Sequence, residues 1–369
     1  MIRTKRILFS AVMMLCGVLI ACIAAELIVR ATQRNTMVLF PRFHSAASYG
    51  PYTIRSMRPN TTFTHTSMDG VWQFAINEKG LRSPPGRDYS KQDGVLRVVC
   101  VGDSHTAGFE VDQRKTYASV IELHLSAKGI SAEVINAGIS GFGTGEALVY
   151  IENEAVNYQP DAIVLGFFAN DYDDNLKSDL FRVVGTELVT NKTVHIPGVQ
   201  ILDRINQFGL IRWLSQHSYA YSFVFNAVWD MKKRALLTEA ERTTQTERAI
   251  PEAGADELLG EHKSALAKAL LARIDDFCAS NKIQFIILDI PQLDLETQQL
   301  ARSLKQDSLP NNFKGHYIDS VAALSDLQGV ADIFVPNGQR HINETTHLLL
   351  GIETSRAILE SINQRAAMR

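Results

Sequence analysis

The sequence predicts an α/β fold built on a parallel β-sheet, and two observations support this prediction. From residue 95 onward, short apolar runs alternate with amphipathic stretches of helical length. The run from Val98 to Val101 is continuously apolar, which is typical of a strand buried on both faces. Strands that alternate with helices pair in parallel through right-handed crossovers. We therefore expect one main α/β domain over residues 93–366.

The elements of this domain follow in order along the chain. Strands are expected in VLRVVCVG, AEVINAG, DAIVLGFF, IQFIILDIP and HYIDSV. Helices are expected near residues 114–128, 144–157, 262–280, 293–305 and from 343 to about 364. A hairpin in FRVVGTELVT and apolar-aromatic helical stretches interrupt this alternation, so we treat residues 176–260 as an insertion near the active face. Residues 31–92 contain turn signals between alternating segments and predict an extended lead-in with short strands.

The amino-terminal segment, residues 1–30, predicts a membrane anchor. Three basic residues precede a stretch of 23 residues, Ile7–Val29, in which Glu26 is the only charge. This length is enough to span a bilayer and exceeds that of an ordinary signal peptide. The positive-inside rule places the amino end in the cytoplasm, so we expect a single-pass protein of the inner membrane with its main domain in the periplasm or outside the cell. Alternatively, Leu19-Ile20-Ala21-Cys22 resembles a lipoprotein cleavage box that would be lipidated at Cys22.

The composition argues against several classes of partner. The net charge is −3, from 37 basic and 40 acidic residues, and no long basic block occurs, so we expect no nucleic-acid partner. The four cysteines form no CxxC pair and no zinc spacing with histidine, so we expect no metal and no cofactor. The sequence does not specify an oligomeric state.

Polar residues gather where the predicted strands end. Gly102-Asp103-Ser104 follows the first strand, a glycine cluster around Gly141 follows the second, and Asn170 follows the third. His341 stands just before the last helix. Carboxyl ends of parallel strands meet at one edge of a sheet and form ligand sites there, so we expect these residues to converge. The alternative for Asp103 and Ser104 is a helix cap.

These residue types match the requirements of acyl transfer. A serine hydroxyl such as that of Ser104 needs a neighbouring base, for which His341 is the natural candidate. A developing oxyanion needs fixed donors, and the Gly141 N–H and the Asn170 amide supply them without a titratable charge. Competing candidates for these roles remain at neighbouring positions: Gly138, Gly143 and His347.

In order and rough spacing, Gly102-Asp103-Ser104, Gly141, Asn170-Asp171 and His341 resemble the four blocks of the SGNH (GDSL-type) hydrolases. The amino-terminal anchor and the AINEKGLRSPP lead-in resemble a bacterial membrane-anchored subgroup. The resemblance implies a three-layer α/β/α fold with a flavodoxin-like sheet. It also implies Ser104 as nucleophile, His341 as base, and an oxyanion hole made by Ser104, Gly141 and Asn170.

The implied activity is hydrolysis of an O-acyl ester, and the implied substrate is an acylated carbohydrate or envelope lipid. Two alternatives stay open: an O-acyltransferase that modifies a cell-surface glycan, and a non-catalytic glycan-binding member of the fold. One departure from the family pattern bears on this choice, because Gly338 and Gln339 occupy the positions of the usual aspartate. We therefore expect a Ser-His dyad assisted by a backbone carbonyl, by Asn337 or by a distant carboxylate.

Overall fold

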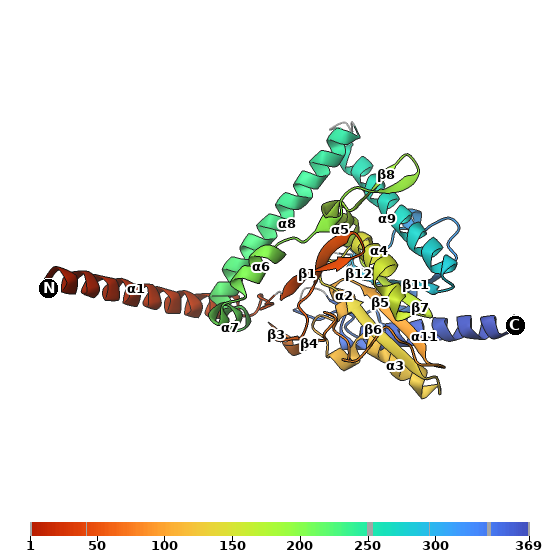
Figure 1. Ribbon diagram of the computed structural model, residues 1–369, viewed down its shortest axis with the longest axis horizontal. Helices are drawn as coiled ribbons and strands as arrows, with labels where there is room; N and C mark the ends of the chain where they lie inside the picture. Colours follow the sequence, from red (N-terminus) through yellow and green to blue (C-terminus); the bar gives the residue numbers. More distant parts are fainter. Residues whose placement is uncertain (1, 42, 249–253, 295, 338–340, 368–369) are drawn as a thin grey trace.

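A five-stranded parallel sheet forms the centre of the main domain (Figure 1). The computed structural model describes residues 2–41, 43–248, 254–294, 296–337 and 341–367. The strand order is β14-β11-β7-β5-β6, which in chain order is the flavodoxin-like order 2-1-3-4-5 and confirms the predicted fold class. The strands are β5 (Leu96–Gly102), β6 (Ala132–Gly138), β7 (Ala162–Phe167), β11 (Gln284–Asp289) and β14 (His316–Asp319).

Helices cover both faces of this sheet and make it the middle of three layers. Helices α3 (Tyr117–Ala127) and α11 (Glu344–Ala367) cover one face, and α4 (Thr144–Asn153) and α9 (Ala255–Ser280) cover the other. The packing of β5 explains why residues 98–101 are all apolar. Val98 and Cys100 pack into the core on the α3 side, whereas Val99 and Val101 pack into the core on the α4 side.

The lead-in forms two β-ribbons that pack against the main domain. The ribbons pair β1 (His44–Tyr49) with β2 (Tyr52–Met57) and β3 (Thr61–Ser67) with β4 (Gly70–Ile76). Phe63 and Phe74 stack at 4.9 Å, and Phe74 also contacts Phe109 of the segment that follows β5. This aromatic cluster holds the lead-in next to the carboxyl end of β5.

The described residues between β7 and α9 fold into a hairpin and several helices. The elements are α5 (Asp171–Ser178), the expected hairpin β8 (Phe181–Val184) and β9 (Glu187–Thr190), β10 (Val194–His195), α6 (Val199–Ile205), α7 (Gly209–His217) and α8 (Tyr219–Glu247). Figure 1 shows α8 running obliquely away from the end of α1 towards the amino end of α9. The edge strand β10 pairs with β2, so this segment also contacts the lead-in.

Helix α1 (Ile2–Gln33) projects from the body of the molecule (Figure 1). An 18-residue window of its segment Thr4–Gln33 has a mean hydropathy of 2.7, and the segment is long and apolar enough for a membrane span, a property that signal sequences share. The carboxylate of Glu26 accepts hydrogen bonds from Ser218 Oγ at 2.8 Å and from Ala220 N at 2.9 Å. The single acid of α1 therefore caps the amino end of α8.

The prediction of a helix near residues 293–305 is wrong. The described residues there form a small hairpin, β12 (Gln292–Leu293) and β13 (Leu300–Ala301). Asp294 Oδ1 accepts hydrogen bonds from the backbone N–H groups of Glu296 and Thr297, and Gln298 adopts a left-handed φ of 56°. This side-chain turn competes with helical hydrogen bonding and reverses the chain. The remaining short elements are α2 (Ser104–Ala107), η1 (Gln113–Lys115), η2 (Ala155–Tyr158), η3 (Gln306–Ser308), α10 (Ser320–Ala323) and η4 (Ser325–Leu327).

Candidate active site

Ser104 stands at the sharp turn between β5 and the short helix α2. Gly102 adopts a φ of 153°, and a Cβ atom there would lie 2.2 Å from Thr106 Oγ1, so only glycine fits this turn. Asp103 Oδ1 accepts a hydrogen bond from the backbone N–H of His105 at 2.8 Å and caps α2. The turn therefore leaves the Ser104 side chain half-buried at the carboxyl edge of the sheet.

The structure brings His341 to this serine. His341 Nε2 lies 2.9 Å from Ser104 Oγ, although 237 residues separate them in the chain. The competing histidine, His347, lies on α11, where its Nδ1 accepts a hydrogen bond from Tyr117 N at 3.0 Å. Burial lowers the pKa of His347 to about 3, so this ring is a neutral acceptor inside the core. The geometry thus favours His341 over His347 as the partner of Ser104.

A carboxylate that the sequence did not single out lies on the other side of the His341 ring. Glu110 Oε2 is 3.4 Å from His341 Nδ1, and Glu110 Oε1 is 3.5 Å from His65 Nε2. Glu110 is only 2% exposed, so it acts in a low-dielectric setting. Burial acts to raise the pKa of Glu110, but hydrogen bonds with His341 and His65 outweigh it and lower this pKa below its usual range. Glu110 is therefore an anion beside the imidazole.

The other candidates for an acid do not take this position. The backbone N–H and the side-chain amide of Asn337 both donate to Asp69, at 3.0 and 2.9 Å, and not to His341. Gly338 and Gln339, where the family pattern has its aspartate, lie outside the described residues. Among the aids that the sequence left open for His341, the structure therefore favours a distant carboxylate.

Arg82 of the lead-in holds the loop that carries Glu110. Its buried guanidinium donates hydrogen bonds to the carbonyl groups of Ala107, Gly108 and Val111. It also lies 3.7 Å from the centre of the Phe74 ring. Glu110 has a left-handed φ of 63°, a conformation that costs energy in a residue with a side chain. The contacts of Arg82 on both sides of Glu110 stabilise this strained loop.

Gly141 and Asn170 line the same pocket as Ser104 and His341, and its volume is about 330 Å³. Gly141 has a left-handed φ of 77°, which glycine adopts readily. Asn170 Nδ2 donates a hydrogen bond to Asp174 Oδ2 at 2.8 Å. Burial raises the pKa of Asp103 to about 6, although the hydrogen bond that Asp103 accepts from His105 N acts to lower this pKa. The four sequence-predicted site residues are thus brought together, and the Asn170 amide is held by the carboxyl group of Asp174.

His105, next to the serine, is buried and not an exposed loop residue. The side chain is 3% exposed, and its ring packs 4.1 Å from that of Phe168 and 4.9 Å from that of His341. Burial lowers the pKa of His105 well below its usual value. The ring is therefore a neutral wall of the pocket beside His341.

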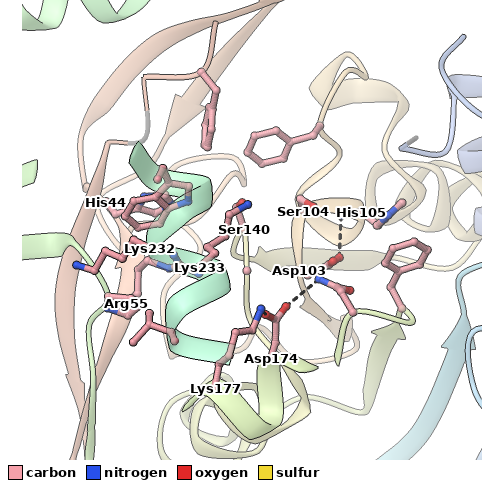
Figure 2. A pocket seen from close by; sticks show the side chains of 18 of the residues that line it. His44, Arg55, Asp103, Ser104, His105, Ser140, Asp174, Lys177, Lys232 and Lys233 are labelled. Carbon is pink, nitrogen blue, oxygen red and sulfur yellow. Dashed lines mark hydrogen bonds and ion pairs between the residues drawn. The ribbon is translucent and has the colours of Figure 1, made fainter. Parts of the chain in front are cut away.

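Two walls of the pocket come from outside the main sheet, one from the insertion that was expected near the active face and one from the lead-in, which sequence reasoning missed. Figure 2 shows His44, Arg55, Lys232 and Lys233 on the side opposite Ser104, with Ser140 between them. The first two belong to the lead-in and the last two to α8. The lead-in wall has no distinct signal in the sequence, because Arg55 stands in TIRSM, which mixes polar and apolar residues.

We compared the chain with known protein sequences and structures. No curated protein sequence matches it. Distant structural similarity is found to the psychrotrophic esterase EstA from Pseudoalteromonas sp., with 14% identity and a TM-score of 0.37 over 72% of this chain and 98% of that one. A lipase/acylhydrolase from Enterococcus faecalis gives 16% identity and a TM-score of 0.38 over 71% and 95% of the two chains. The acetyl xylan esterase Axe2 from Geobacillus stearothermophilus gives 11% and 0.38 over 71% and 94%.

A sequence model of the GDSL-like Lipase/Acylhydrolase family matches residues 100–289, just over half of the chain. The match contains Ser104, Gly141 and Asn170 and ends before His341, which joins the site through the fold. The parallel sheet and the GDS turn at its edge agree with this match. The chain therefore belongs to the GDSL-like lipase/acylhydrolase family of ester hydrolases.

Proposed function

We propose that the protein hydrolyses an O-acyl ester through an acyl-serine intermediate, with Ser104 as nucleophile and His341 as general base. The contact of 2.9 Å between Ser104 Oγ and His341 Nε2 carries this proposal. A serine hydroxyl is a weak nucleophile until a base within hydrogen-bond reach removes its proton. The pocket is open to an ester at this point, because Ser104 and His341 both line it.

The reaction follows from these positions. Ser104 Oγ attacks the carbonyl carbon of the ester while its proton moves to His341 Nε2. The imidazolium then gives this proton to the departing alcohol oxygen, which leaves an ester between the acyl group and Ser104. Water attacks this acyl-enzyme, His341 takes a proton from the water, and the proton returns to Ser104 Oγ as the carboxylic acid leaves.

We assign Glu110 as the acid that completes the triad. Its anionic carboxylate lies 3.4 Å from His341 Nδ1, where it favours the tautomer with a proton on Nδ1 and leaves Nε2 free to accept from Ser104. When the imidazolium forms, this buried negative charge stabilises it. His65, which lies 3.5 Å from the other oxygen of Glu110, orients the carboxylate. These contacts weigh against a non-catalytic member of the fold.

The oxyanion hole in this proposal consists of the N–H groups of Ser104 and Gly141 and the amide of Asn170. Preorganised donors of this kind stabilise the negative oxygen of the tetrahedral intermediate. Asn170 Nδ2 donates to Asp174 Oδ2 in the structure, which leaves the second N–H of this amide for the oxyanion. Ser104, Gly141 and Asn170 all line the pocket, which supports this assignment.

We further propose that residues 1–30 anchor the protein in the inner membrane and that residues 93–366 lie in the periplasm or outside the cell. Residues 31–92 connect the two, and residues 176–260 form the insertion. The contacts of Glu26 with Ser218 and Ala220 support this arrangement, because they supply hydrogen-bond donors from the main body of the protein to the lone acid of α1. A bilayer location makes an acylated envelope carbohydrate or lipid the natural substrate.

Intact-mass measurement of protein purified from membranes tests the anchor. Retention of residues 1–30 is the expected result, and loss of the first 21 residues with a lipid on Cys22 would replace the anchor with a lipoprotein. Fusion of alkaline phosphatase after residue 367 tests the orientation, since this reporter is active only outside the cytoplasm.

Hydrolysis of 4-nitrophenyl acetate by the full-length chain in detergent tests the activity. We expect Ser104→Ala to lower kcat by about 10³-fold or more. Ser126→Ala, at an exposed position of α3, serves as the matched control and keeps the wild-type rate. Addition of a glycan acceptor separates hydrolysis from transfer: acetate release that the acceptor does not change is expected, and acetylation of the acceptor would make the protein an acyltransferase.

A further inference from the structure

One wall of the pocket holds a buried cation that the reaction described above does not use. Arg55 lies in β2 and is only 8% exposed. The guanidinium nevertheless lines the pocket, and Figure 2 shows it on the wall opposite Ser104. An arginine stays protonated in proteins, so this group is a permanent positive charge at the site.

The charge of Arg55 lacks a direct partner in the part of the chain that the structure describes. Its Nε has no hydrogen-bond acceptor there, and the guanidinium forms no ion pair within 4.0 Å with a described carboxylate. The nearest acids act on it only through space: Asp174 pairs with Lys177, and Glu146 accepts a hydrogen bond from Gly143 N at 3.0 Å. Burying a charge without a partner is costly, so a group that binds this guanidinium from the pocket is expected.

Arg55 also lies against the backbone of the candidate oxyanion hole. A Cβ atom placed on Gly141 would be only 2.2 Å from Arg55 Nη2. The guanidinium therefore occupies the space that any other residue at position 141 would fill. A substrate with its ester carbonyl at Gly141 would bring the atoms next to that ester within reach of Arg55.

Besides Arg55, lysines outnumber carboxyl groups in the lining of the pocket. Lys177, Lys232 and Lys233 line the pocket together with two carboxyl groups, those of Asp103 and Asp174. Asp174 is paired with Lys177, and Lys233 Nζ lies 3.0 Å from Asp230 Oδ1. Among the described residues, Lys232 has no ion-pair partner within 4.0 Å. Histidines 44, 65, 105, 195 and 341 complete the set of titratable groups that face the pocket. The wall opposite Ser104 is thus positive.

We propose that the ester substrate carries an anionic group, a carboxylate or a phosphate, close to its acyl ester, and that Arg55 binds this group. The planar guanidinium offers paired N–H donors that match the two oxygens of either anion. Lys232 and Lys233 add positive potential at the open side of the same wall (Figure 2). This inference rests on the proposed ester hydrolysis and names the chemical class of its substrate.

Three acetyl esters with one common frame test the proposal on the full-length chain in detergent: 4-acetoxybenzoate, 4-acetoxyphenyl phosphate and the neutral 4-acetoxybenzamide. We expect kcat/KM for a charged ester to exceed that for the amide by roughly 10- to 100-fold. This is the gain in affinity that a hydrogen bond to a charged group typically gives. The carboxylate and phosphate arms show which anion the site prefers. Arg55→Gln is expected to abolish the preference and to retain turnover of the neutral amide.

Arg356→Gln, an exposed substitution on α11 with the same loss of charge, is the control and keeps the preference. Equal kcat/KM values for the three esters in the wild type would overturn the proposal. So would an equal loss on all three esters in Arg55→Gln, because Arg55 would then act on the oxyanion common to them.

A competition experiment on the wild type gives an answer even where Arg55→Gln fails to fold. Hydrolysis of 4-acetoxybenzamide is followed in the presence of 4-hydroxybenzoate or 4-hydroxybenzamide. We expect the carboxylate to inhibit at a concentration at least about 10-fold lower than the neutral amide does. Equal inhibition contradicts the anion site, whereas failure of the wild type to hydrolyse any of the three esters contradicts the proposed function instead.

Discussion

Glu110 Oε2 lies 3.4 Å from His341 Nδ1, although 231 residues separate the two in the chain. The carboxylate that faces the histidine therefore comes from the loop after the GDS turn and not from the segment before the histidine. Ser104 and Glu110 share one short, tightly held segment, and His341 joins it from the opposite end of the domain.

Glu110→Gln is expected to lower kcat by on the order of 10³-fold, because the amide keeps the shape of the side chain but offers no charge to the imidazolium. The measurement is kcat for 4-nitrophenyl acetate with the full-length chain. Asn337→Ala is the matched test of the other candidate for this role, and we expect it to keep the wild-type kcat, since Asn337 binds Asp69. The reverse order of effects would remove Glu110 from the site.

Arg82→Met is expected to lower the free energy of unfolding by about 3 kcal/mol or more, because three buried carbonyl groups lose a charged donor. Urea denaturation measures this change. Arg114→Met, whose side chain is 87% exposed, is the control and is expected to change stability by no more than about 0.5 kcal/mol. If Arg82→Met were as stable as the control, the lead-in would have no part in holding the Glu110 loop.

Gly141→Ala is expected to reduce kcat by about 10²- to 10³-fold, because the new Cβ collides with Arg55 and displaces the N–H of the oxyanion hole. Gly129→Ala separates this effect from backbone strain. Gly129 has a similar φ of 80° but open space around its Cβ position, so this variant is expected to lose about 1–2 kcal/mol of stability and no activity. Equal kcat values for the two variants would contradict the role of Gly141.

Acidification is expected to destabilise the protein through His347. Its pKa is near 3 in the folded chain against an ordinary value of 6.5, so between these pH values the unfolded chain binds a proton that the folded chain does not. Stability from this group is therefore complete above pH 6.5 and falls as the pH decreases, by up to about 1.4 kcal/mol per pH unit.

His347→Gln keeps an acceptor for Tyr117 N but does not titrate, so its unfolding free energy should change less between pH 7 and pH 5 than that of the wild type. Urea denaturation at the two pH values measures the difference. Parallel changes in both proteins would show that His347 does not contribute to the pH dependence.

Much of the sheet and part of the site could be predicted from the sequence, because both depend on local patterns. The continuous apolar run of β5 and the polar residues at Ser104 and Asn170 mark a buried strand and its carboxyl end in any parallel sheet. His341 needed the family resemblance, since no local pattern distinguishes it from His347.

The rest depends on tertiary contacts that no short stretch encodes. Glu110 faces His341 because its backbone is left-handed and because Arg82 holds the loop around it. The local sequence FEVD, residues 109–112, indicates neither feature. Arg55 enters the pocket because β2 packs beside Gly141. The helix expected near residues 293–305 failed because the side chain of Asp294 stabilises a turn more strongly than apolar periodicity stabilises a short helix.

The most direct test of the account is to find the residue that carries a covalent adduct. The full-length protein is treated with a fluorophosphonate, digested and mapped by mass spectrometry, with Ser140→Ala as a control for the neighbouring serine of the pocket. The account predicts one adduct, on Ser104, that persists in Ser140→Ala, disappears in Ser104→Ala and forms more slowly in Glu110→Gln. An adduct on another serine, or none on the folded wild-type protein, would contradict it.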